Sequence, residues 1–169
     1  AIGSAFAFHL ARAGHEVTVI TRAQRLATLQ REVAIVTTRG ERARIRVEPE
    51  LPASEAFDLV LLTVLGWQID ALLPSLAANP SAAFLFAFNT YGGLERFRDA
   101  VGTERFGWAF PAIVARLLEG RLQAQVVPRV FSFLQVTTLG AMPDHTPPWI
   151  EAWSRRFSAS SRWGICRGT

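Results

Sequence analysis

Two arginines near the start of the chain have the charge and spacing to bind one phosphate group. Arg22 follows a β-branched run at residues 17–20, and Arg25 lies one helical step further on. A guanidinium is planar and permanently charged, which suits paired hydrogen bonds to phosphate oxygens. At this place nucleotide-binding folds carry an acid for the ribose 2′-hydroxyl of NAD, or an arginine for the 2′-phosphate of NADP. The pair therefore favours NADP, and the alternative is that both arginines are solvated at a helix start.

A glycine near the first residue fits the same chemistry. Ala1-Ile2-Gly3 matches the last three positions of the G-x-G-x-x-G pattern, whose final glycine lies inside the first helix. That glycine lets the helix pack closely on the sheet while a pyrophosphate rests on the helix N-terminus. We expect Ile2 and Gly3 to contact the pyrophosphate. The alternative is a packing glycine in an ordinary helix, because the earlier glycines of the pattern would lie before Ala1.

Helices and strands alternate along the part of the chain that would position these residues. Periodicity predicts helices at 2–13, 23–30, 68–76, 94–100 and 147–157, and strands at 17–20, 33–38, 43–47, 57–64, 83–88, 122–127 and 131–138. The strand at 57–64 is almost wholly apolar, which is typical of a central parallel strand. This order predicts an α/β fold with a doubly wound, mainly parallel sheet and helices on both faces.

The residues that follow two apolar strands are candidates for a second part of the site. Leu65 and Gly66 follow the strand at 57–64, and Asn89 follows the strand at 83–88. Ligands of such sheets bind at the carboxyl ends of the strands. An asparagine amide can donate to a bound carbonyl or ribose hydroxyl. We therefore expect a ligand near Leu65, Gly66 and Asn89.

Taken in order, these segments resemble the N-terminal domain of the ketopantoate reductase (2-dehydropantoate 2-reductase) family. The matching motifs are AIG at 1–3, LARAGHEVTVITR at 10–22, FDLVLLTV at 57–64, WQ at 67–68, and Asn89 with GG at 92–93. The resemblance covers about residues 1–110 and extends more loosely to 140. It implies a Rossmann-type domain followed by a helical domain, with the nicotinamide and the substrate near Leu65, Gly66 and Asn89. It also implies reduction of the small 2-keto acid 2-dehydropantoate to pantoate by NADPH, in pantothenate biosynthesis. Separately, the single cysteine, Cys166, and the lack of a signal-peptide pattern predict a cytoplasmic setting.

The same resemblance divides the chain. Residues 1–140 would form the dinucleotide-binding domain, with its first strand upstream of the sequence, and residues 141–169 would end that domain or begin a linker. The helical domain of the family would lie outside these 169 residues.

Two departures from the family concern the reaction itself. Leu65 stands where the family has a lysine near the cofactor. Thr90 stands where the family has a glycine, directly after the asparagine that matches Asn89. Carbonyl reduction needs a proton donor at the developing alkoxide, and the chain contains no lysine for this role. The catalytic residue stays unassigned, and we expect the chain alone to be inactive. We favour a piece of a longer enzyme; the alternative is a diverged or non-catalytic NADP-binding protein.

Composition excludes several other classes of protein. Half of the 169 residues are hydrophobic and 19% are charged, which suits a packed domain and not a disordered chain. The net charge of +4 comes from scattered arginines, which do not form a nucleic-acid-binding stripe. No apolar run is long enough to span a membrane, and no His, Cys, Asp or Glu spacing suits a metal. The sequence leaves open whether the protein forms a homodimer. Trp149 and Trp153 share a helix face and belong either to the core or to a surface that another domain or a second subunit would cover.

Overall fold

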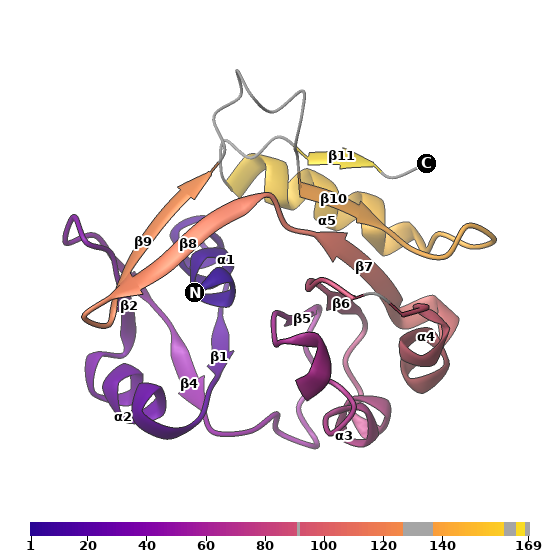
Figure 1. Ribbon diagram of the computed structural model, residues 1–169, viewed down its shortest axis with the longest axis horizontal. Coiled ribbons are helices and arrows are strands. Elements are labelled where there is room, and N and C mark those ends of the chain that lie inside the picture. The colour runs from indigo at the N-terminus through magenta and orange to yellow at the C-terminus, as the bar shows by residue number, and fades with distance from the viewer. Residues whose placement is uncertain (91, 127–136, 161–164, 168–169) are drawn as a thin grey trace.

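The computed structural model describes residues 1–90, 92–126, 137–160 and 165–167 (Figure 1). The helices are α1 (Ile2–Arg12), α2 (Ala23–Glu32), α3 (Leu73–Ala78), α4 (Glu95–Val101) and α5 (Pro148–Ser160), with short 3-10 helices η1 (Gly66–Gln68) and η2 (Thr103–Arg105). The strands are β1 (Thr18–Ile20), β2 (Ala34–Val36), β3 (Arg42–Arg44), β4 (Arg46–Glu48), β5 (Val60–Leu62), β6 (Phe84–Phe86), β7 (Phe106–Phe110), β8 (Ile113–Leu118), β9 (Arg121–Val126), β10 (Thr137–Gly140) and β11 (Ile165–Arg167). Helices and strands alternate as the sequence predicts.

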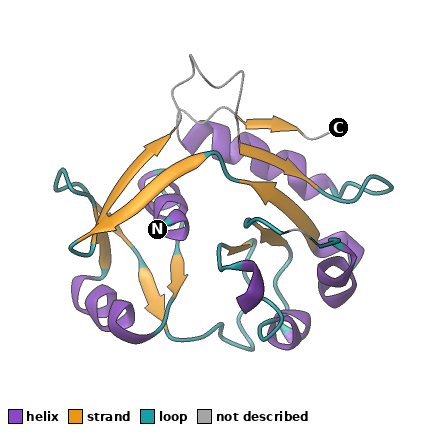
Figure 2. Cartoon of the chain, viewed as in Figure 1, coloured by secondary structure: helices purple, strands orange, loops and turns teal. Residues whose placement is uncertain are grey.

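The sheets contain both parallel and antiparallel strand pairs (Figure 2). β1 pairs with β4 in parallel, and β5, β6 and β7 are parallel neighbours in a five-stranded sheet of order β11-β10-β7-β6-β5. β10 runs antiparallel to β7, and the pairs β2–β3 and β8–β9 are antiparallel hairpins. No ladder joins the β1–β4 pair to β5 within the described residues. The arrangement is the α/β, Rossmann-type fold that we expected.

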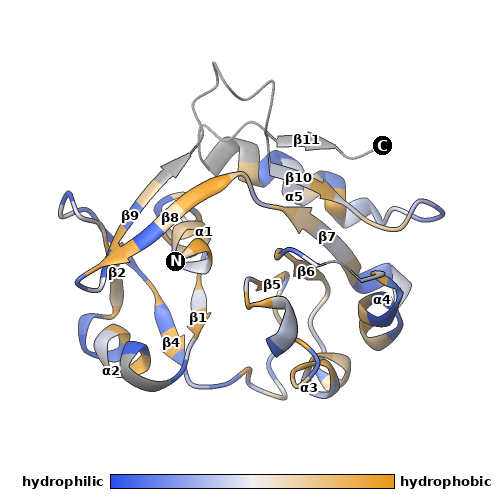
Figure 3. Cartoon of the chain, in the orientation of Figure 1, coloured by the Kyte–Doolittle hydropathy of each residue, from blue (hydrophilic) through white to orange (hydrophobic). Residues whose placement is uncertain are grey.

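The five-stranded sheet separates two hydrophobic cores. Because successive strand residues point to opposite faces, Leu85 packs with α1 and α5, whereas Phe84 and Phe86 pack with α3 and α4. Phe6 of α1 contacts Phe157 of α5 at a ring-centroid distance of 5.7 Å. Figure 3 shows hydrophobic and hydrophilic residues interspersed along the helices, and the two cores contain apolar residues of α1, α3, α4 and α5. The sheet is therefore covered on both faces.

The aromatic residues of α5 settle one alternative left open by the sequence. Trp153 is only 8% exposed, and its ring lies 5.6 Å from Phe157 and 5.8 Å from His15. Trp149 is half-buried, and its indole Nε1 donates to the backbone oxygen of Glu104 at 2.9 Å. Trp153 belongs to the core of the chain itself, so its burial does not require a partner.

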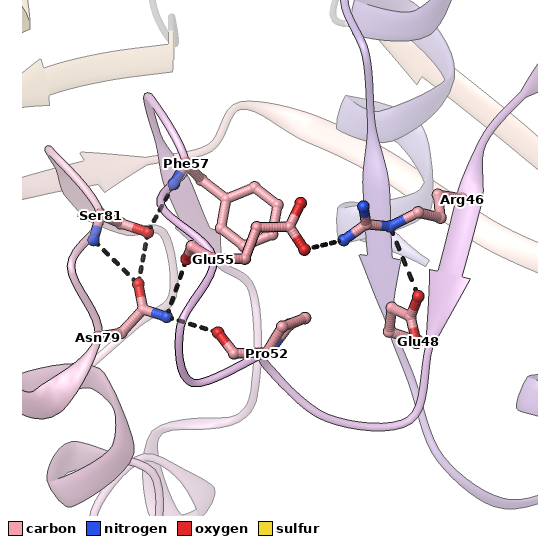
Figure 4. Close-up of polar contacts among 7 residues, drawn as sticks. All are labelled: Arg46, Glu48, Pro52, Glu55, Phe57, Asn79 and Ser81. Carbon is pink, nitrogen blue, oxygen red and sulfur yellow. Dashed lines mark hydrogen bonds and ion pairs between the residues drawn. The ribbon is translucent and has the colours of Figure 1, made fainter.

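Polar side chains tie together the amino-terminal ends of β5 and β6 (Figure 4). Asn79, which is 1% exposed, donates from Nδ2 to the backbone oxygens of Pro52 at 2.9 Å and Glu55 at 3.3 Å. Its Oδ1 accepts from both the backbone N–H and the hydroxyl of Ser81. The Ser81 oxygen in turn accepts from the N–H of Phe57 at 3.0 Å. These bonds fix the loop before β5 against the loop before β6.

The structure corrects two predicted strands. The segment 43–47 was expected to pair as a whole with 33–38, but only Arg42–Arg44 does so; Arg46–Glu48 leaves the hairpin and pairs with β1. The strand expected to be central, 57–64, is ordered as β5 over Val60–Leu62 and lies at the edge of its sheet in the described residues. Apolar composition reports burial, whereas strand order depends on long-range pairing, which local pattern does not encode.

Other boundaries were wrong for local reasons. The helix expected at 68–76 divides into η1 and α3, and Pro74 lies in the first turn of α3, where its missing N–H costs least. Three described strands were missed altogether: β7, β8 and β11. The expected strand at 122–127 corresponds to β9, while most of the one at 131–138 lies outside the described residues.

Candidate functional site

The first turn of α1 packs directly on the carboxyl end of β5. A Cβ atom on Gly3 would collide with Oγ1 of Thr63, the residue that follows β5. Glycine allows this close approach, because a side chain at position 3 would meet the Thr63 side chain unless one of the two moved. Ala1, the N-cap residue, has no side-chain hydrogen bond to the first turn. The first amides of α1 thus lie at the edge of the sheet where a ligand phosphate could accept from them.

The two candidate arginines point to different places. Arg25 donates from Nη2 to the hydroxyl of Ser4 in the first turn of α1, at 2.9 Å. Burial lowers the pKa of Arg25, and the charge of Glu32 opposes this shift, yet a guanidinium stays protonated at any ordinary pH. Arg22 is exposed at the N-cap of α2, and no described residue accepts a hydrogen bond from its side chain. The fold therefore holds Arg25 beside α1 and leaves Arg22 accessible.

The loops after β5 and β6 meet at the same edge. A Cβ on Gly66 would lie 3.2 Å from the backbone oxygen of Asn89. The side chain of Gln68 accepts from the N–H of Leu65 at 3.0 Å and shapes the loop after β5. Leu65 is 60% exposed, so the position that carries lysine in the resembled family faces solvent here. Gly66 and Asn89 are thus brought together as expected for one ligand-facing edge.

The threonine that replaces a glycine does not strain its loop. Within the described residues the only non-glycine residues at positive φ are Val33 and Glu119, so Thr90 has an ordinary backbone conformation. Its hydroxyl accepts from the N–H of Gly92 at 3.3 Å. Asn89 is exposed, and its amide has no hydrogen-bond partner among the described residues. That amide is therefore available to a ligand.

A hollow of about 420 Å³ lies next to this edge. Its walls come from the loop after β6, the start of α4 and the carboxyl end of β7: Asn89, Thr90, Gly92, Leu94, Trp108 and Phe110. Sequence reasoning missed the two aromatic residues because it did not predict β7. The alternation of Phe106, Trp108 and Phe110 was the available signal, since residues two apart share one face of a strand.

A second hollow, of about 540 Å³, lies between α2 and the turn joining β8 to β9. Its charged residues are Arg25, Arg31 and Arg121 together with Glu32 and Glu119. The two carboxylates offset the guanidiniums, so the hollow is not a simple anion site. It shares only Arg25 with the residues that surround the first turn of α1.

Two negative findings apply to the described part of the chain. No three His, Cys, Asp or Glu side chains within it gather closely enough to hold a metal ion. None of its helices has the length and apolar character needed to cross a bilayer.

The order of strands and helices, with α1 packed on the carboxyl end of β5 and helices on both faces of the sheet, defines an α/β domain of Rossmann type. Comparison with known proteins is more specific: the family model described as ketopantoate reductase PanE/ApbA matches residues 1–132. The chain belongs to the ketopantoate reductase family.

Individual relatives agree with this assignment. The chain is 33% identical over 130 residues to a 2-dehydropantoate 2-reductase from Vibrio cholerae, a match covering 73% of the chain and 38% of that protein. A 2-dehydropantoate 2-reductase from Geobacter metallireducens superposes with a TM-score of 0.75 at 16% identity, covering 99% of this chain and 55% of that one. D-mandelate dehydrogenase, solved with NADH and anilino(oxo)acetate, gives 0.73 at 16% identity, covering 99% and 54%. The chain thus spans about half the length of these two solved proteins, and the matched region spans 38% of the Vibrio cholerae protein.

Proposed function

We propose that this chain is the dinucleotide-binding part of an NADPH-dependent reductase that acts on a small 2-keto acid. Family membership supports an oxidoreductase that uses a nicotinamide cofactor, and the Vibrio cholerae relative supports 2-dehydropantoate as substrate. The observation that carries the proposal is the close packing of Gly3 on Thr63, because it sets the start of α1 at the carboxyl edge of the sheet. That edge is where such folds bind dinucleotides.

The arginines favour the phosphorylated cofactor. In this proposal the backbone amides at Ile2 and Gly3 bind the pyrophosphate, and the accessible guanidinium of Arg22 binds the 2′-phosphate. Arg25, held by Ser4 at 2.9 Å, adds positive charge beside the first turn of α1. When bound, the cofactor supplies the hydride. The chain's own residues bind and orient its phosphates.

The substrate would lie at the loops after β5 and β6. The free amide of Asn89 donates to the keto oxygen or to a ribose hydroxyl, and Leu65 and Gly66 form the adjoining wall. Leu65 supplies neither charge nor proton there. Since arginine is a poor proton donor, we propose that the donor is not among these 169 residues and that the chain alone does not reduce keto acids.

The second candidate is a diverged NADP-binding protein without catalysis. The specific observation in its favour is Leu65, an exposed aliphatic side chain at a position where the family pattern has lysine. Both candidates require the dinucleotide to bind. They differ in whether the longer protein containing this chain oxidises NADPH in the presence of 2-dehydropantoate.

Calorimetric titration with NADPH and NADH tests the cofactor. Arg22→Asp should weaken NADPH by roughly 1.5 to 3 kcal/mol, because one charge-assisted contact is lost and a repulsive charge is introduced. NADH should change much less, since a carboxylate can accept from its 2′-hydroxyl. Arg39→Asp, at an exposed arginine in the β2–β3 turn, is the matched charge control. Equal losses for both cofactors, or loss with the control alone, would contradict the assignment.

A further inference from the structure

The first turn of α1 has a positive charge beside it, where a helix favours a negative one. The first hydrogen bond of this helix runs from the N–H of Ala5 to the oxygen of Ala1, at 3.1 Å. The amides before Ala5 have no helical partners, and they make this end of the helix partially positive. The first turn contains no acidic residue. Arg25 nevertheless donates to the hydroxyl of Ser4 in this turn, at 2.9 Å. Two positive groups therefore lie close together, an arrangement that a bound anion would stabilise.

The charge of Arg25 is only weakly compensated by the described residues. Burial lowers the pKa of Arg25, and the charge of Glu32, about two turns later on α2, opposes this shift. Arg25 forms no ion pair within the described part of the chain. Its guanidinium has five N–H donors, and the described residues accept from Nη2 alone. The other donors are left for a ligand.

The start of α2 directs Arg22 and Arg25 to different parts of a dinucleotide. Helical side chains lean toward the N-terminus of their helix, so Arg25, in the first turn of α2, reaches back to the start of α1. Arg22 precedes α2 with an extended backbone, φ −124° and ψ 169°, just after β1. In dinucleotide-binding folds the end of this strand faces the ribose 2′ group, and the pyrophosphate rests on the first helix. The two arginines therefore match two different phosphates.

We infer that Ser4 is a positioning residue for the cofactor: it holds Arg25 at the start of α1, where this guanidinium binds the pyrophosphate together with the helix amides. The inference rests on the proposed function, which puts a dinucleotide at this edge of the sheet. Arg22 then distinguishes NADPH from NADH. Arg25 serves both cofactors equally, because both carry the same pyrophosphate. The two arginines thus bind separate phosphates, in contrast to the shared phosphate considered from the sequence.

Titration of the chain with NADPH and NADH tests the role of Arg25. Arg25→Gln removes the charge and keeps a polar donor. It should weaken both cofactors by the same factor, roughly tenfold, because each complex loses a charge-assisted hydrogen bond to phosphate. The ratio of the two affinities should stay at its wild-type value. Arg31→Gln is the matched control, since it removes the same charge from an exposed position on the same helix. It should change either affinity by less than about twofold.

A double-variant cycle tests whether Ser4 acts through Arg25. Ser4→Ala removes the acceptor that holds the guanidinium and should weaken both cofactors by about threefold. In the Arg25→Gln background the same substitution should have no further effect on binding, because no guanidinium is left to position. Arg25→Lys keeps the charge without the planar fork, so it should lose less affinity than Arg25→Gln.

The stability of the ligand-free chain provides a readout that a structural role would move in the opposite direction. Arg25→Gln relieves the repulsion at the positive end of α1, so it should not lower the melting temperature without cofactor. With added NADH, however, its melting temperature should rise less than that of wild type, because bound ligand stabilises in proportion to the logarithm of its affinity. A residue needed only for folding would lower the melting temperature of the ligand-free chain.

The outcomes separate this inference from the function on which it rests. If Arg25→Gln weakens NADPH alone, Arg25 belongs to the 2′-phosphate; if it weakens neither cofactor, Arg25 is structural. Either result overturns the inference, while binding by wild type upholds the proposed function. A Ser4→Ala effect that is equally large in the Arg25→Gln background overturns the positioning role. Failure of wild type to bind either dinucleotide overturns the proposed function and the inference with it.

Discussion

The two ends of β6 each carry an asparagine, and the two are used in opposite ways. Asn79, before the strand, is 1% exposed, and both ends of its amide are hydrogen-bonded (Figure 4). Asn89, after the strand, is exposed and has no such partner among the described residues. A buried amide must be satisfied internally, whereas an exposed one is satisfied by water and can exchange it for a ligand. The asparagine at the amino end of the sheet therefore serves stability, and the one at the carboxyl end is exposed where the proposed function expects a ligand.

A nearby arginine strengthens the contrast. At the amino end, Arg105 donates to four backbone oxygens, those of Val101 at 2.7 Å, Asn79 at 2.8 Å, Ala77 at 3.3 Å and Ser81 at 3.5 Å. At the carboxyl end, Arg22 has no partner in the described residues. Arg105 thus holds backbone segments together at the amino end, whereas the exposed Arg22 has no such role in the described part of the chain.

The largest expected effect is on stability, at the amino end. Asn79→Ala leaves two backbone oxygens and the N–H of Ser81 without their partner, so the free energy of unfolding should fall by about 3 kcal/mol. Urea unfolding followed by circular dichroism measures the loss. A change below about 0.5 kcal/mol would show that water replaces the amide and would remove the contrast between the two ends.

A smaller loss is expected where α1 meets β5. Gly3→Ala places a methyl group against Oγ1 of Thr63, and overpacking of this kind costs roughly 1 to 3 kcal/mol, partly offset by the better helix propensity of alanine. The double variant with Thr63→Ala should recover most of the stability, because it removes the colliding atom. Unfolding curves of the two single variants and the double variant form the cycle. Additive losses would mean that the two residues do not touch.

At the carboxyl end, a substitution of Asn89 should weaken ligand binding and leave the stability of the fold unchanged. Asn89→Ala should leave the unfolding midpoint unchanged and weaken a bound 2-keto acid by about 1 kcal/mol, the value of one hydrogen bond. Unfolding curves and ligand-observed NMR on the same preparation measure both quantities, with Asn79→Ala as the contrasting variant. If Asn89→Ala instead lowers stability and leaves binding intact, the asparagine is only a turn residue.

The smallest effect concerns pH. Burial lowers the pKa of His9 in α1, and the charge of Glu41 partly opposes the shift. In the window below the ordinary histidine pKa of about 6.5, the unfolded chain binds the proton more readily than the folded one. Stability should therefore be fully present above about pH 6.5 and decline as the pH falls, by less than about 1 kcal/mol for this half-buried group.

The control for this pH effect is His9→Gln, which should flatten the decline between pH 7 and pH 5. Dinucleotide affinity should not follow the same curve through Arg22 or Arg25, because guanidiniums keep their charge throughout this range. A pH dependence that is identical in wild type and His9→Gln would assign the titration to another group.

Local chemistry was readable from the sequence alone. The alternation of helices and strands fixed the fold class, since periods of 3.6 and 2 residues report which side of each element is buried. Gly14, at the end of α1, has a φ of +91°, as expected for a glycine that closes a helix. The nearness of Gly66 to Asn89 also followed from sequence, because the ends of adjacent parallel strands meet at one edge.

Tertiary structure decided what local pattern does not contain. The contact between Arg25 and Ser4, which are 21 positions apart, depends on where the fold places α2 relative to the first turn of α1. The edge position of β5 and the departure of Arg46–Glu48 from its hairpin depend on strand pairing across long loops. The hollow at Phe110 exists only because β7 pairs beside β6 and ends next to Asn89. Side-chain types specify what each residue can bind, but distances between sequence-distant groups are set by packing of the whole chain.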